Sequence, residues 1–203
     1  MGVLGGTFNP PHLGHMALAR HALSELALER VLLVPACGAP HKLEGADPGP
    51  EHRLRMCELA VRDVPGVEVC AMEIERGGPS YTVDTLRALN AGHPDAQLTF
   101  IVGADTARTL REWREPRELL ELADLAVAGR EGAGREEVLH VLAELEAEER
   151  VAFVEMPKVD ISSSMIRERV ARGTPVAELV DEAVASYISG QRLYRVSGQG
   201  GER

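Results

Sequence analysis

The chain has 203 residues, of which 44% are hydrophobic and 27% are charged, so it can bury a substantial core without disulfide or metal staples. Its formal net charge of −10 argues against nucleic acid as a ligand, because binding to a phosphate backbone demands a basic face. No apolar run approaches about 18 residues and no basic leader precedes the first motif, so we expect a cytoplasmic protein without a membrane segment.

The opening stretch combines a short apolar run, two glycines and two histidines. Residues 2–15 read GVLGGTFNPPHLGH, and apolar residues at helical spacing follow immediately. This pattern predicts a strand, a glycine turn and a helix N-terminus, an arrangement that presents backbone N–H groups to a phosphate. Gly5 and Gly6 would let a ligand approach the main chain closely. His12 and His15 would project from one side of the first helical turn, unless the stretch is only a tight turn with two surface histidines.

Strands and helices alternate along the rest of the chain. Apolar, β-branched runs predict strands at 30–35, 67–72, 97–103, 124–129 and 151–156. Amphipathic patterns predict helices at 51–62, 117–122, 134–147, 163–171 and 176–189, and a helical stretch that holds Leu110 and Trp113. A further helix would run through Leu89, with Ser80 or Thr82 as its cap. Residues 36–50, rich in Gly, Pro and Ala, predict a loop that substrate could order.

The alternation predicts a doubly wound, Rossmann-like α/β fold, in which a parallel sheet carries helices on both faces. We expect a single domain over residues 1–196 and a disordered tail over residues 197–203. The first strand, at about five residues, is short for a central strand, which indicates a clipped start or a frayed first turn. The sequence leaves the oligomeric state open, and a homo-oligomer is compatible with it.

A second polar group follows the last predicted strand, in the string Ile161-Ser162-Ser163-Ser164-Met165-Ile166-Arg167. Hydroxyl groups at a helix N-terminus can cap the helix or bind a phosphate, and the arginine one turn further on could reach the same phosphate. A plain serine cap with a surface arginine is the alternative interpretation.

Three shorter features complete the set. Pro40-His41-Lys42 lies in the predicted loop, and Pro79-Ser80-Tyr81-Thr82-Val83-Asp84-Thr85-Leu86 precedes or begins a helix. Taken alone, the first could be an ordinary exposed loop and the second an ordinary helix start. Gly103-Ala104-Asp105 ends a strand, and Trp113, the only tryptophan, follows among charged residues. That ring is either a core or interface anchor or a face on which a heteroaromatic ring stacks.

Two of these strings resemble the signatures of the adenylyl- and cytidylyltransferase superfamily. Residues 5–15 resemble G-[ST]-F-[DN]-P-x-H-x-G-H, and residues 161–167 resemble I-S-S-[ST]-x-I-R. With P-H-K, S-Y-T-x-D-T-L and G-A-D…W in order, nearly the whole chain resembles the bacterial nicotinate-nucleotide adenylyltransferases. It departs at Asn9, where many relatives have Asp, and at Ser164, where Thr is usual. A role that needs a carboxylate at position 9 is therefore in doubt.

The resemblance implies that ATP and nicotinate mononucleotide react to give deamido-NAD and pyrophosphate, with no covalent intermediate. The residues that would contact ATP are Gly5, Gly6, Thr7, Phe8, His12, His15, Gly103, Asp105, Ser162, Ser163 and Arg167. Those that would contact nicotinate mononucleotide are Lys42, Thr82, Thr85, Trp113 and Arg114. Of all these, His12, His15, Lys42 and Arg167 would act in catalysis.

Mg²⁺ would come with ATP, held mainly by phosphate oxygens and water, and the sequence offers no carboxylate cluster for a protein-bound metal. Two alternatives stay open. The chain could adenylylate another phosphorylated acceptor, such as nicotinamide mononucleotide or phosphopantetheine, or it could be a non-catalytic nucleotide-binding protein on the same fold.

Overall fold

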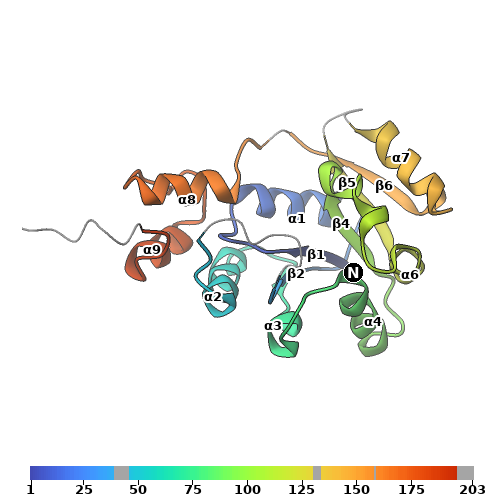
Figure 1. The fold of residues 1–203 in the computed structure, drawn as a ribbon, viewed down its shortest axis with the longest axis horizontal. Coiled ribbons are helices and arrows are strands. Elements are labelled where there is room, and N and C mark those ends of the chain that lie inside the picture. Colours follow the sequence, from blue (N-terminus) through green and yellow to red (C-terminus); the bar gives the residue numbers. More distant parts are fainter. Residues whose placement is uncertain (39–45, 130–133, 158, 196–203) are drawn as a thin grey trace, which may run out of the picture.

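A six-stranded parallel sheet forms the centre of the molecule (Figure 1). The computed structural model describes residues 1–38, 46–129, 134–157 and 159–195. The sheet has the strand order β3-β2-β1-β4-β5-β6, and every neighbouring pair is parallel. The strands are β1 (Gly2–Gly6), β2 (Val31–Pro35), β3 (Val67–Val69), β4 (Thr99–Gly103), β5 (Asp124–Gly129) and β6 (Val151–Glu155). This is the doubly wound sheet that the sequence predicts.

Helices connect the strands and lie on both sides of the sheet (Figure 1). They are α1 (Leu13–Glu25), α2 (Pro50–Val61), α3 (Met72–Arg76), α4 (Thr82–Gly92), α5 (Ala104–Ala107), α6 (Pro116–Leu122), α7 (Arg135–Glu144), α8 (Ser163–Ala171) and α9 (Glu182–Gly190). Two short 3₁₀ turns, η1 (Leu110–Glu112) and η2 (Glu148–Arg150), complete the described elements. None of the helices in the described ranges is long and apolar enough to cross a membrane.

Two hydrophobic cores form because successive side chains of a strand point to opposite faces. Along β2, Leu33 joins the first core, and Leu32 and Val34 join the second. The first core also takes buried residues from α1, α2, α8 and α9, whereas the second takes them from α4, α5, α6 and α7. Strands buried on both faces read as continuous apolar runs, which is why the sequence pattern located them well.

The predicted strand at 67–72 is too long. β3 ends at Val69, and Met72 begins α3. Cys70 still donates its backbone N–H to Leu33 O, at 2.9 Å, before the chain turns away from the sheet. β3 is an edge strand with only β2 as a neighbour, and its Val67 and Val69 face the first core, whereas Cys70 and Met72, which follow it, pack against the second core.

The predicted helix at 176–189 begins too early. α9 starts at Glu182, because the Asp181 carboxylate caps it by accepting the Ala183 N–H at 2.8 Å. The Leu179 carbonyl accepts the backbone N–H of Leu13, at 3.0 Å, and so ties this segment to the start of α1.

The predicted cap of the helix through Leu89 is also wrong. Tyr81 occupies the N-cap position of α4 and makes no side-chain cap bond. The Ser80 hydroxyl accepts the backbone N–H of Cys37 instead, at 2.9 Å, which joins the segment before α4 to the loop after β2. A contact across 43 residues overrides the local capping signal.

Candidate active site

The carboxyl ends of β1 and β4 frame the crevice where strand order reverses. β1 pairs with β2 from Gly2 to Gly6 but with β4 only at Gly2 and Val3, so the two strands part toward their carboxyl ends. Gly5 is exposed although β1 is a central strand, and the added Cβ of an alanine there would meet only Phe100, at 3.8 Å. Open sheets bind ligands in such crevices.

Two histidine rings stack beside this crevice at the start of α1. The His12 and His15 ring centroids are 3.7 Å apart with an interplanar angle of 28°, and Phe8 meets His15 edge-on at 4.9 Å. The backbone N–H of His12 donates to His15 Nδ1 at 3.2 Å. A Cβ on Gly14 would lie 3.0 Å from His12 Nδ1, so the glycine makes room for the stacked ring. The sequence prediction that both histidines share one side is confirmed.

Burial changes the chemistry of His12. Its side chain is 9% exposed, and desolvation lowers the pKa of the imidazole from 6.5 to about 4. Nδ1 is buried and has no hydrogen-bond partner among the described residues. At neutral pH the imidazole is therefore neutral, and a neutral ring has one donor and one acceptor nitrogen.

The N-terminus of α8 contacts the loop between β1 and α1, which we call the β1–α1 loop (residues 7–12). Ser163 Oγ donates to Pro10 O at 2.8 Å, and Arg167 Nη1 donates to Asn9 O at 2.9 Å. Ser162 caps α8 by accepting the Met165 N–H at 3.2 Å. The Ser163 and Arg167 contacts span 153 and 158 residues, so the two strings share one surface, and Ser162, Ser163 and Arg167 lie next to the loop that holds His12.

The Asn9 side chain joins two further parts of the chain at this surface. Its Oδ1 accepts a hydrogen bond from the buried Tyr194 hydroxyl at 2.7 Å, and its Nδ2 donates to Ala46 O at 3.1 Å. A carbonyl only accepts, so the amide nitrogen must face Ala46 and the amide oxygen must face Tyr194. An aspartate could accept the hydrogen bond from the Tyr194 hydroxyl but could not donate one to Ala46 O, which gives a physical reason for the asparagine. No sequence pattern points to the Tyr194 contact.

A second group of residues gathers where residues 36–38, the start of α4 and the turn after η1 meet; we call the segment between β2 and α2, described at residues 36–38 and 46–49, the β2–α2 loop. Cys37 and Ser80 are hydrogen-bonded, and Ser80 N donates to Gly38 O at 2.9 Å. The Arg114 guanidinium lies over the Tyr81 ring at 4.7 Å from its centroid. Thr82, the first residue of α4, is thus brought next to the segment of Arg114.

Trp113 is half-buried at the end of η1. Its ring meets Phe100 edge-on at 5.8 Å between centroids, and Nε1 donates to Thr109 Oγ1 at 3.2 Å. Phe100 in turn lies next to Gly5, so it connects the tryptophan with the crevice. One edge of the indole is anchored against the second core, which leaves the other part of the ring available to a ligand.

Other residues predicted for the site have different surroundings. Thr85 is 2% exposed and donates its hydroxyl to the buried Glu73 Oε1 at 2.5 Å, so it supports α4 from beneath rather than presenting a hydroxyl at the surface. Gly103 ends β4 beside the crevice, and Asp105, the second residue of α5, forms an exposed ion pair with Arg108. Lys42 lies outside the described residues.

Arg53 is the residue at this edge that sequence reasoning missed. It projects from α2, is 1% exposed, and donates to backbone carbonyls of both the β1–α1 and β2–α2 loops. A signal was present in the sequence. Arg53 has the helical spacing of Met56, Cys57 and Ala60, all buried, so a helical wheel places the arginine on the apolar face.

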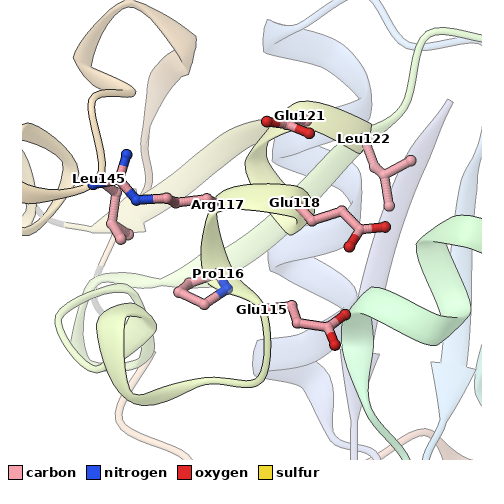
Figure 2. Close-up of a pocket in the computed structure, with 7 residues that line it drawn as sticks. All are labelled: Glu115, Pro116, Arg117, Glu118, Glu121, Leu122 and Leu145. Carbon is pink, nitrogen blue, oxygen red and sulfur yellow. The ribbon is translucent and has the colours of Figure 1, made fainter.

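An open hollow of about 630 Å³ lies elsewhere, along α6. Figure 2 shows its lining residues, which are Glu115, Pro116, Arg117, Glu118, Glu121, Leu122 and Leu145. Arg117 forms an ion pair with Glu146 at 2.8 Å and donates to Glu144 O at 3.2 Å. The hollow contains none of the residues predicted for the site, and its acidic lining is unsuited to phosphate.

The reversed strand order, the exposed glycine and the stacked histidines define a nucleotide-binding α/β protein of the Rossmann type. The sequence model of the cytidylyltransferase-like family matches residues 3–169. The chain therefore belongs to the cytidylyltransferase-like family.

Individual relatives are more specific than the family model. A Symbiobacterium thermophilum protein is 40% identical over 95% of this chain and 93% of its own length. A Roseiflexus protein is 43% identical over 96% and 98%. Both carry the name "Probable nicotinate-nucleotide adenylyltransferase". Among solved structures, Plasmodium falciparum nicotinic acid mononucleotide adenylyltransferase complexed with APC has the same fold, with a TM-score of 0.76 at 17% identity over 95% of this chain and 96% of that one.

The depressed pKa of His12 predicts a loss of stability in acid. The neutral form is favoured in the folded state, so its stabilisation is present above pH 6.5 and is lost as the pH falls toward about 4. Between these values the unfolding free energy of the native chain should fall by about 2–3 kcal/mol more than that of His12→Gln. Urea unfolding at a series of pH values measures this, with the exposed His140→Gln as control. Parallel pH profiles for native chain and His12→Gln would contradict it.

The two-sided role of the Asn9 amide predicts that Asn9→Asp destabilises this chain. The change removes the donor to Ala46 O and places a buried carboxylate against a carbonyl, which should lower the unfolding free energy by about 1–3 kcal/mol. Asn90→Asp, the same change at an exposed position of α4, is the matched control. Equal unfolding midpoints for the two variants in urea would show that the Ala46 contact contributes nothing.

Proposed function

We propose that the protein transfers the adenylyl group of ATP to nicotinate mononucleotide and releases pyrophosphate. The observation that carries the proposal is the contact between the β1–α1 loop and α8, which brings His12, His15, Ser163 and Arg167 to one surface beside the crevice. The full-length similarity to nicotinate-nucleotide adenylyltransferases supports this acceptor over phosphopantetheine.

The reaction needs no protein nucleophile. A 5′-phosphate oxygen of the mononucleotide attacks the α-phosphorus of ATP, and the bond from that phosphorus to the oxygen bridging to the β-phosphorus breaks as pyrophosphate leaves. The attacking oxygen is already anionic, so catalysis consists of positioning the two phosphates and stabilising charge on the leaving group. The stacked histidines and Arg167 would supply that stabilisation, and the exposed backbone of Gly5 would let the triphosphate approach.

The triphosphate half of the site follows from the contacts of the β1–α1 loop. Gly5, Gly6, Thr7 and Phe8 would face the phosphates through backbone groups, and the N-terminus of α8 with Ser162 and Ser163 would hold the departing pyrophosphate. Gly103 and Asp105, at the carboxyl end of β4, would face the adenosine ribose. ATP would arrive as its Mg²⁺ complex, with the metal as part of the substrate. The described residues contain no group of three or more metal-ligating side chains.

The acceptor half would consist of Thr82, Trp113 and Arg114, with Lys42 approaching the reacting phosphates. Trp113 would stack on the pyridine ring, and Thr82 with backbone N–H groups of the Trp113 segment would receive the nicotinate carboxylate. The stacking of Arg114 on Tyr81 supports this half, because it holds the two segments side by side. Thr85 would act indirectly, by fixing α4 through Glu73.

Pyrophosphate release tests the reaction and its acceptor. The protein is incubated with ATP, Mg²⁺ and either nicotinate mononucleotide, nicotinamide mononucleotide or phosphopantetheine. The proposal expects the highest kcat/KM with nicotinate mononucleotide, since only its carboxylate finds donors at the acceptor half. A preference for phosphopantetheine would overturn the acceptor, and nucleotide binding without pyrophosphate release would favour a binding protein.

Trp113→Ala should raise KM for the mononucleotide much more than KM for ATP. Loss of one stacked face costs about 1–3 kcal/mol, which corresponds to a rise in KM of roughly 5- to 150-fold. Trp113→Phe keeps an aromatic face and should recover most of the loss. Equal changes in the two KM values would remove Trp113 from the ring-binding role.

A further inference from the structure

Arg53 connects the loops that carry the two halves of the site. The arginine projects from α2, and its guanidinium is directed at the carboxyl edge of the sheet. Nη1 donates to Thr7 O at 3.0 Å and to Ala36 O at 2.5 Å, and Nη2 donates to Cys37 O at 2.8 Å. Thr7 belongs to the β1–α1 loop, and the other two carbonyls begin the β2–α2 loop.

These carbonyls lie where the ladder between β1 and β2 ends. The last backbone hydrogen bond between the two strands runs from Ala36 N to Gly6 O, at 2.9 Å. Beyond it the chains separate, and buried carbonyls on both sides need donors. A guanidinium offers several N–H groups in one rigid plane, so a single side chain satisfies both loops at once.

The charge of Arg53 has a partner at the far end of the β2–α2 loop. Nε donates to Asp47 Oδ1 at 3.1 Å, and Asp47 also accepts the Gly49 N–H at 3.0 Å. Both described ends of this loop, Cys37 and Asp47, are therefore held by the same guanidinium. A buried cation is costly unless it is paired and hydrogen-bonded, and here Asp47 pairs with it and three carbonyls accept its N–H groups.

We propose that Arg53 is a positioning residue that fixes the separation between the β1–α1 loop, which would bind ATP, and residues 36–37, which contact the acceptor half through the Cys37–Ser80 hydrogen bond. The inference rests on the proposed function. Without Arg53, each loop would keep other contacts, such as Cys37 to Ser80 and Arg167 to Asn9, so each substrate would still bind to its own half of the site. Without the shared guanidinium the halves would no longer be held at the distance at which one phosphate attacks the other.

Such a role affects turnover more than binding. Misplacement of reacting groups by about 1 Å can cost 10²-fold in rate, whereas the affinity of each substrate for its own half would change little. Lysine at position 53 keeps the charge but presents a single ammonium group, which cannot satisfy three carbonyls and a carboxylate in one plane. Arg53→Lys is therefore the informative variant, and Arg53→Met removes the charge as well.

The experiment compares the native chain, Arg53→Lys, Arg53→Met and Arg55→Met. Arg55 is on the same helix, but its side chain is 54% exposed and forms a surface ion pair with Glu58 at 2.8 Å, so it is the matched control. For each protein we would measure the thermal midpoint, the separate Kd values of a non-hydrolysable ATP analogue and of nicotinate mononucleotide, and kcat at saturation. We expect Arg53→Lys to lower kcat by at least about 10-fold with both Kd values within about 3-fold of native, and Arg55→Met to behave as native.

The outcomes separate a positioning role from a purely structural one. If Arg53→Lys lowers the thermal midpoint but keeps the native kcat per folded molecule, the positioning role is overturned. If Arg53→Met does not fold, Arg53→Lys decides the question alone, by whether its kcat falls while its two Kd values stay near native. A native chain that releases no pyrophosphate would overturn the proposed function and the positioning role with it, whereas an active native chain with an unaffected Arg53→Lys would overturn the positioning role only.

Discussion

Right-handed crossovers carry the chain away from β1 in both directions, so the helices after β1 and after β4 leave the sheet on opposite faces. Neither set of helices covers the carboxyl edge between these two strands. Because β4 pairs with only the first two residues of β1, the glycines at the end of β1 pair with β2 but have no strand partner on the β4 side. The stacked histidines, the docked α8 and the tryptophan are all arranged around this opening.

Two networks hold the loops around the opening, and each uses buried polar groups. Asn9 connects the β1–α1 loop with Ala46 and with Tyr194 near the described end of the chain. Arg53 connects the same loop with Ala36 and Cys37. Backbone carbonyls are the main acceptors in both, so the side chains fix where the main chain runs. Ligand-binding loops are often mobile, and these networks restrict that freedom at the two ends of the β2–α2 loop.

The sequence predicted the parts of the molecule that depend on local periodicity. β5 and α8 lie where their apolar patterns place them, and His12 and His15 share one side as predicted, although His12 is the N-cap of α1 and has an extended backbone. Predictions failed where a distant contact competes with a local signal. Ser80 bonds Cys37 instead of capping α4, and the start of α9 is set by Asp181 while Leu179 is bonded to Leu13. The Asn9–Tyr194 bond spans 185 residues and has no local pattern.

The division of the interior into two cores has a consequence for how such a protein can diverge. Phe8 of the β1–α1 loop, Ile166 of α8 and Tyr194, which bonds Asn9, belong to the core on one face of the sheet. Trp113 packs against the core on the other face. Substitutions around Trp113 can therefore be accommodated by repacking one face while the other stays intact. The architecture therefore allows recognition of a new acceptor to evolve while the reaction itself stays the same.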